Sequence, residues 1–148
     1  MYATHLIEEI LGPIPAGQPA DGVGLLARLH HLIRKGLPAR VVGKLEKALG
    51  LSAPQSARLL AVSQSSRKRF KQTPGRRLDE AASDRVVRIV STVAEAAEIF
   101  GDEAKAIAWF KTPSLALNGV QPIELMTSDP GAKIVRDELN RIRYGHWA

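Results

Sequence analysis

The residues with the clearest potential for binding are a group of basic side chains in the middle of the chain. Between residues 63 and 77 the sequence contains six basic side chains and no acidic one, namely Arg67, Lys68, Arg69, Lys71, Arg76 and Arg77. Such groups bind phosphate, and the release of counterions makes this binding weaken steeply with salt. The segment predicts contact with nucleic acid. The alternative is a solvated basic face.

The residues around these cations fit a helix-turn-helix. Ala57 would be the small residue where two helices cross, and Ala61 would lie in the tight turn. Ser63 would cap the second helix, and Phe70 would turn toward the core. Such a helix enters the major groove, where Gln pairs with adenine, Arg pairs with guanine, and lysines mostly hold phosphate. Arg67 stands where many such helices carry an apolar residue. An alignment of this segment to the motif that is shifted by one residue is therefore the alternative. The predicted DNA-binding residues are Gln64, Ser65, Ser66, Arg67, Lys68, Arg69 and Lys71.

No group of residues has the pattern of an enzyme active site. The four histidines, His5, His30, His31 and His146, form no helical metal-binding pair. No serine lies in a nucleophile-elbow context, and no glycine-rich loop follows a strand. The sequence has no cysteine, which excludes disulfides and thiolate metal sites and suits a reducing cytosol. We therefore expect a non-enzymatic protein with no catalytic residue, no metal and no cofactor.

The sequence carries no signal for export or for membrane insertion. No apolar run approaches the roughly 18 residues that a spanning helix requires. The N-terminus lacks a basic region and soon meets Glu8 and Glu9, unlike a secretory signal. We expect a cytoplasmic protein without a membrane partner.

The net charge of +6 is distributed unevenly. Residues 1–39 hold three basic and three acidic side chains, residues 40–90 hold twelve and four, and residues 91–148 hold six and eight. A cationic middle and a mildly acidic C-terminal part point to different partners. We expect a helical extension with a Pro/Gly linker over residues 1–39. A helix-turn-helix DNA-binding region over residues 40–90 and a helical domain that binds a protein over residues 91–148 would follow.

Apolar side chains recur with the helical period along most of the chain. No segment alternates between apolar and polar residues for long enough to predict a strand. The longer helices are expected over residues 3–11, 23–35 and 79–100, and Gly50 is expected to stop a helix. The segment 52–55 has the form of a capping box. The predicted fold is all-α.

The C-terminal part is expected to consist of short helices with fixed turns. Trp109 and Phe110 are adjacent in one helix and cannot share a face, so at least one should lie in the core. The last helix is predicted to begin with Asp129 as its N-cap and Pro130 as its first residue. Gly145 should end it, which leaves an aromatic tail that could fill a pocket in a partner or fold back. The predicted inner face of this helix consists of Ile134, Leu139 and Ile142.

In their order and spacing these features resemble the Xre/MbcA/ParS antitoxins of bacterial type II toxin-antitoxin systems. The resemblance covers roughly residues 41 to 147, about 70% of the chain, and no single motif in it is rare. The matching segments are 59–63, 78–88, 100–102, 106–110, 117–119 and 122–126, together with Pro113, Gly131, Val135, Leu139, Ile142 and Tyr144-Gly145.

The resemblance implies an Xre-like helix-turn-helix domain that binds operator DNA, followed by a small helical toxin-binding domain. In this family the toxin is typically a RES-domain protein that consumes NAD⁺ or transfers ADP-ribose from it. The C-terminal region of the antitoxin covers the toxin's active-site entrance. The toxin-facing candidates are Trp109, Asn118, Gly119, Pro122, Arg141, Tyr144, Gly145, His146 and Trp147. The chain departs from the family pattern at Ala61, where glycine is usual, and at Phe110, where leucine is common.

Two functions are compatible with these features. The leading hypothesis is an antitoxin that also represses its own operon, as a homodimer or in a larger complex with the toxin. The alternative is an ordinary dimeric repressor with no toxin partner. In either case two copies would present paired recognition helices to a palindromic site.

Overall fold

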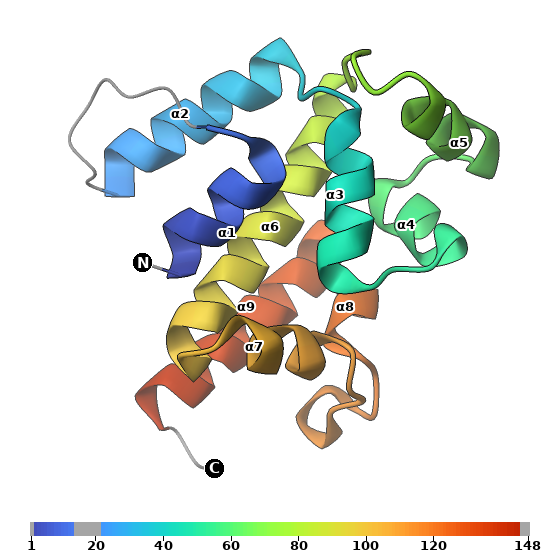
Figure 1. Cartoon of the computed structure of the whole chain (residues 1–148). Helices are drawn as coiled ribbons and strands as arrows, with labels where there is room; N and C mark the ends of the chain where they lie inside the picture. Colours follow the sequence, from blue (N-terminus) through green and yellow to red (C-terminus); the bar gives the residue numbers. More distant parts are fainter. Residues whose placement is uncertain (1, 14–21, 146–148) are drawn as a thin grey trace. The chain divides into compact units, whose positions relative to one another are not determined.

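The computed structural model describes residues 2–13 and 22–145 (Figure 1). Within these ranges the backbone forms nine α-helices and one short 3-10 helix and no strand, which confirms the predicted all-α fold. None of the helices in these ranges is long and apolar enough to cross a membrane. The chain divides into two compact units, one of residues 6–90 and one of residues 1–5 and 91–148.

The first unit contains most of the predicted long helices. Its elements are α1 (Tyr2–Leu11) from residue 6 onward, α2 (Gly22–Lys35), α3 (Arg40–Leu49), α4 (Ala53–Leu60), α5 (Gln64–Gln72) and the first half of α6 (Glu80–Phe100). The helices expected over residues 3–11, 23–35 and 79–100 are therefore confirmed, each to within one residue at either end.

Local sequence signals set the ends of α3 and α4. α3 turns Val41, Val42, Leu45 and Leu49 into the core and ends at Gly50, which adopts a left-handed φ of 61°. The predicted capping box then begins α4: the Gln55 backbone N–H donates to Ser52 Oγ at 3.3 Å, and the Ser52 N–H donates to Gln55 Oε1 at 3.1 Å. These bonds satisfy two donors that a helix start leaves unpaired.

Backbone hydrogen bonds tie together the two connections that flank α3, α4 and α5. The Ala39 N–H donates to the Arg76 carbonyl at 2.6 Å, and the Leu78 N–H donates to the Leu37 carbonyl at 2.8 Å. Pro38 and Arg77 form an isolated antiparallel bridge between these bonds. Gly36, with a φ of 88°, permits this approach, because a Cβ there would lie 2.6 Å from the Leu78 carbonyl oxygen. The three helices are thus fixed at both ends.

The second unit is built from shorter elements. The second half of α6 is followed by α7 (Glu103–Phe110), η1 (Leu115–Leu117), α8 (Pro122–Leu125) and α9 (Asp129–Tyr144). The Asp102 side chain caps α7 by accepting from the Ala104 N–H at 2.8 Å. α8 contacts both α7 and α9. Phe110, Met126, Val135 and Leu139 are buried in this part of the chain.

Two expectations for α9 are wrong. Its N-cap is Ser128, whose hydroxyl accepts from the Gly131 N–H at 3.1 Å, and Asp129 is the first helical residue. Ile134 and Ile142 do not face inward, since they are 48% and 37% exposed. The close approach of Gly131 to α8 explains the difference, because a Cβ at Gly131 would lie 1.9 Å from the Leu125 carbonyl oxygen. This contact turns the 131, 135, 139 side of the helix inward and leaves the two isoleucines on its flanks.

Candidate nucleic-acid and protein interfaces

The predicted helix-turn-helix is present in the first unit. α4 ends at Ala61, which adopts a left-handed conformation with φ 53° and ψ 45°, and the Val62 N–H donates to the Ala57 carbonyl at 3.0 Å. Ser63 then caps α5, because its hydroxyl accepts from the Ser66 N–H at 3.1 Å. α4 and α5 contact each other across this turn. Ala57, Ala61 and Ser63 thus occupy the positions that the sequence predicts for them.

The predicted DNA-binding residues all lie on α5, with differing accessibility. Gln64, Ser65, Lys68, Arg69 and Lys71 are exposed, whereas Ser66 and Arg67 are half-buried. Arg69 Nη2 donates to Ser66 Oγ at 3.1 Å. No residue of α5 is fully buried, so Phe70 is half-buried and not the core residue that the sequence predicts. The helix therefore lies on the surface of its unit and presents a basic face.

A buried carboxylate on α3 holds α5 in place. Arg67 Nε donates to Glu46 Oε2 at 2.8 Å, and Arg67 Nη2 donates to Glu46 Oε1 at 2.7 Å. Lys71 Nζ donates to the same Oε1 at 3.0 Å. The exposed fraction of the side chain is 7% for Glu46 and 15% for Arg67. Two of the seven predicted DNA contacts therefore join α5 to α3, and the Arg67 guanidinium points inward.

The electrostatics of this cluster keep its members charged. Burial alone would raise the pKa of the Glu46 carboxyl, but hydrogen bonds led by the one from Arg67 outweigh it, so the net pKa is lowered. The hydrogen bond to Glu46 in turn raises the pKa of Arg67. The carboxylate is ionised at neutral pH and offsets part of the charge of α5. The role of Glu46 does not follow from the sequence, where its one signal is an acidic residue beside the apolar stripe of α3.

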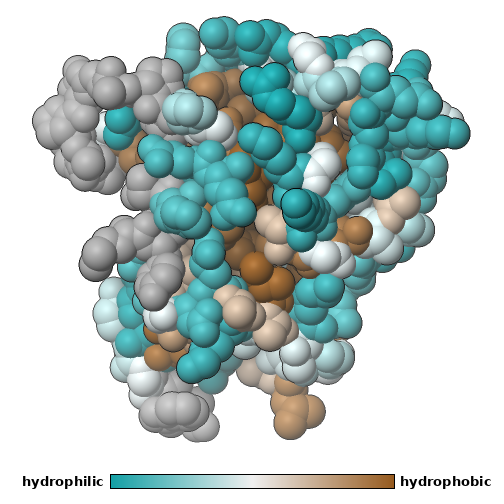
Figure 2. Space-filling view, in the orientation of Figure 1, coloured by the Kyte–Doolittle hydropathy of each residue, from teal (hydrophilic) through white to brown (hydrophobic). Residues whose placement is uncertain are grey.

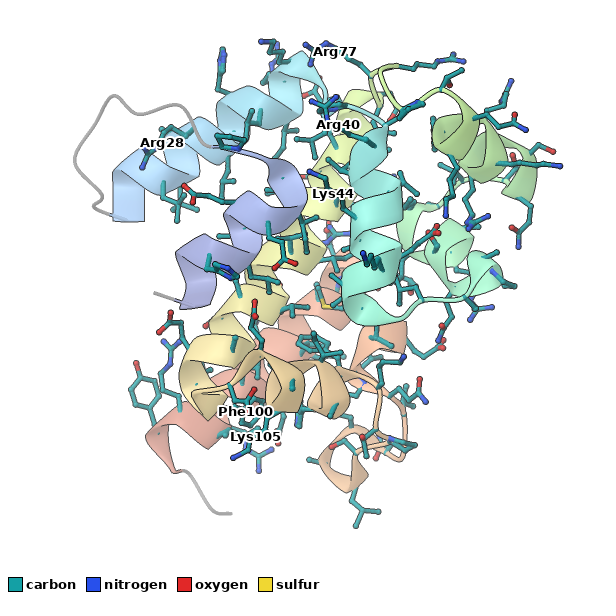
Figure 3. The ribbon with its side chains drawn as sticks, in the orientation of Figure 1. Arg28, Arg40, Lys44, Arg77, Phe100 and Lys105 are labelled. Carbon is teal, nitrogen blue, oxygen red and sulfur yellow. The ribbon has the colours of Figure 1, made fainter. Side chains whose placement is uncertain are left out.

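A second basic row lies on α3 itself. Arg40, Lys44 and Lys47 are exposed and follow each other at the spacing that places side chains on one helix face. The row extends over about 10 Å, at the rise of 1.5 Å per helical residue. Figure 3 labels Arg40 and Lys44, which project from the same side of α3. This row was not among the predicted DNA contacts, although its spacing in the sequence is visible.

The two aromatic residues of α7 have different environments. Phe110 is 1% exposed and belongs to the core, whereas Trp109 is half-buried. The ring of Trp109 lies 5.9 Å from that of Phe100 and meets the ring of Phe110 edge-on at 5.0 Å. The prediction that at least one of the adjacent pair is in the core is confirmed. Only part of the Trp109 side chain is exposed and can contact a partner.

The predicted toxin-binding residues that follow α7 lie in the loop before α8 and at the start of α8. Asn118 and Gly119 are exposed and adopt left-handed conformations, with φ of 58° and 77°. Pro122 is buried as a first-turn residue of α8, a position that needs no backbone N–H. Its ring is therefore part of the interior of this unit.

The remaining predicted toxin-binding residues belong to the last turn of α9 or follow it in the sequence. Arg141 is exposed and donates to Glu138 at 3.0 Å, and Tyr144 is 67% exposed. Gly145 ends the helix with a φ of 64°, as predicted. The predicted contacts His146 and Trp147 lie outside the described residues.

The two units have separate matches among protein families. Residues 28–91 match the antitoxin Xre-like helix-turn-helix domain. Residues 95–145 match the antitoxin Xre/MbcA/ParS C-terminal toxin-binding domain. The chain belongs to the Xre/MbcA/ParS antitoxin family. The family match begins at residue 28, within α2, and thus before residue 41, where the resemblance seen in the sequence begins.

Curated proteins of the same family are similar to the chain over long stretches. The antitoxin Xre of Photorhabdus laumondii subsp. laumondii is 29% identical over 119 residues, which are 79% of each chain. That of Pseudomonas putida is 26% identical over 118 residues, 80% of this chain and 72% of the relative. That of Yersinia enterocolitica is 36% identical over 64 residues, 43% of each. Membership of this family, with both domains present, supports an antitoxin and DNA-binding role.

Proposed function

We propose that the chain is a non-catalytic, cytoplasmic antitoxin that neutralises a RES-domain toxin and represses its own operon by binding operator DNA. The observation that carries this proposal is the combination of an exposed basic helix in a helix-turn-helix with a toxin-binding domain in one chain. We assign DNA binding to residues 40–90 and toxin binding to residues 91–148, with residues 1–39 as an N-terminal extension.

The DNA-binding surface is centred on the N-terminal and outer parts of α5. Gln64 and Ser65 lie in the first turn, which enters the major groove in this motif, and Lys68 and Arg69 remain exposed behind them. Arg67 and Lys71 set the position of the helix through Glu46. The row on α3 is suited to flanking phosphates. Two copies would read a palindromic operator.

The toxin-binding surface is assigned to the second unit. Asn118, Gly119, Arg141 and Tyr144 are exposed there, and Trp109 is exposed in part. The family resemblance implies that the C-terminal region covers the active-site entrance of a toxin that consumes NAD⁺ or transfers ADP-ribose. No NAD⁺ site is needed on this chain, because the antitoxin acts by occlusion.

Replacement of Lys68 and Arg69 with alanine tests the division of roles. Both side chains are exposed, so we expect a folded protein whose operator affinity falls strongly. The slope of log affinity against log salt should shrink by about 2 for each bound protomer, one unit for each lost phosphate contact. Toxin neutralisation should be unchanged. The control is Lys133→Ala together with Arg136→Ala, which removes the same charge from exposed positions of α9.

The outcomes of this experiment separate the two roles. Unchanged operator binding in the Lys68→Ala, Arg69→Ala variant would remove α5 as the DNA-binding element. Loss of neutralisation in a folded sample of the same variant would contradict the division between the two surfaces.

A further inference from the structure

Leu115 is the most exposed of the large hydrophobic side chains in the described residues. Its exposed fraction is 97%, compared with 67% for the next two, Leu26 and Tyr144. In Figure 2 hydrophobic atoms project at the end of the loop that follows α7. Ala116 and Val120 are also exposed in this loop. Single hydrophobic residues on surfaces are common, but one that is almost fully exposed at the end of a fixed loop is not explained by the fold.

The loop that carries Leu115 is held by its own hydrogen bonds. The Ser114 N–H donates to the Val120 carbonyl at 3.1 Å, and the Gly119 N–H donates back to the Ser114 carbonyl at 2.7 Å. The Asn118 N–H closes the 3-10 turn on the Leu115 carbonyl at 3.2 Å. Leu117 is 7% exposed and anchors the loop in the core. Leu115 is therefore presented in a fixed position, which reduces the entropy lost when a partner binds.

The composition of the loop indicates what covers it. Residues 112–123 contain no charged side chain, in a chain of which 24% is charged. A nucleic-acid contact would need cations here, so DNA is not the occupant. A loop tip alone buries far less than the roughly 800 Å² per partner of a stable interface, so the loop fits an apolar pocket within a larger interface.

We propose that Leu115 is an anchor residue that inserts into an apolar pocket on the surface of the toxin. This inference rests on the proposed function. It is supported by the position of the loop inside the segment 95–145 that matches the toxin-binding domain, and by its continuity with exposed Asn118 and Gly119. Buried apolar anchors surrounded by weaker contacts contribute most of the affinity of many interfaces.

The test measures binding of the full chain to the purified RES-domain protein of the same host. Leu115→Asp and Leu115→Ala are compared with the wild type and with Leu26→Asp, which makes the same change at the exposed leucine of α2. Because Leu115 makes almost no contact with the rest of the chain, its variants should melt at the wild-type temperature. We expect the dissociation constant to rise at least about 30-fold for Leu115→Asp, less for Leu115→Ala and not for Leu26→Asp.

Each other outcome overturns the inference. If the wild type binds the RES-domain protein and Leu115→Asp binds equally well, Leu115 is no anchor, although the proposed function stands. If Leu115→Asp dissociates a homodimer at unchanged toxin affinity, the loop is occupied by a second copy. If the wild type does not bind the RES-domain protein at all, the proposed function fails and the anchor with it.

Discussion

Glu46 on α3 and Arg67 on α5 form a two-point ion pair, with Nε and Nη2 of the guanidinium 2.8 and 2.7 Å from the two carboxylate oxygens. The pair joins residues 21 positions apart in the sequence and is largely buried. Planar guanidinium–carboxylate pairs of this kind fix orientation as well as distance. The pair therefore sets the angle at which the recognition helix leaves the rest of the helix-turn-helix unit.

Glu46→Gln should make DNA binding tighter for unrelated sequences and less specific for the operator. The substitution leaves the charges of Arg67 and Lys71 without their partner, and it loosens α5. We expect a steeper salt dependence and a smaller ratio of operator to random-sequence affinity, measured by fluorescence anisotropy. Asp137→Asn is the control, because it removes one negative charge from an exposed residue of α9. Equal changes in both variants would mean that only net charge matters.

The stability of the chain should fall in acid in a way that depends on Glu46. The folded pKa of this carboxyl lies below its ordinary value of 4.5, so its contribution is fully present above that pH. The contribution is lost as pH falls from there through the lower folded pKa. Urea unfolding of the wild type and of Glu46→Gln between pH 7 and pH 3 should show a shallower acid limb in the variant. Parallel curves would show that the ion pair contributes no pH-dependent stability.

Ala61→Gly should stabilise the chain. Ala61 adopts a positive φ of 53°, a conformation that costs an L-residue with a Cβ about 1 kcal/mol or more and glycine almost nothing. Part of this gain is offset by the greater freedom of glycine in the unfolded chain. We expect the free energy of unfolding to rise by about 0.5–1 kcal/mol. The same substitution at Ala108, an exposed position inside α7, should lower it by about 1 kcal/mol. A decrease for Ala61→Gly would contradict the conformational argument.

Gly131→Ala should destabilise the toxin-binding unit. The added methyl group would lie 1.9 Å from the Leu125 carbonyl oxygen, so α8 and α9 would have to move apart. We expect a loss of about 3 kcal/mol, at the upper end of overpacking effects. Gly75→Ala is the control, since nothing lies within 4 Å of a Cβ there. If both variants had the wild-type melting temperature, the close contact between α8 and α9 would be excluded.

The sequence predicts the local features of this fold well. The capping box at Ser52 and Gln55, the cap at Ser63 and the helix stop at Gly50 each depend on residues close together in the chain, and all are present. The all-α fold follows from the period of the apolar residues over long helices. The turn at Ala61 has the expected position although the residue is not the usual glycine.

The features that the sequence did not predict depend on contacts between distant segments. The role of Arg67 changes because Glu46, which is far from it in sequence, reaches its guanidinium. Ile134 and Ile142 look like core residues by spacing, yet the approach of Gly131 to Leu125 rotates α9 so that Val135 and Leu139 are buried instead. Periodicity predicts that a helix has an inner face, whereas packing decides which of two neighbouring stripes it is.

Purification of the tagged chain from its host, with identification of every co-purified protein by mass spectrometry, tests the antitoxin function most directly. We predict a stoichiometric RES-domain partner that depletes NAD⁺ once it is freed from the chain and does not do so in the complex. Recovery of the chain with operator DNA and without such a protein would contradict this function and indicate an ordinary dimeric repressor.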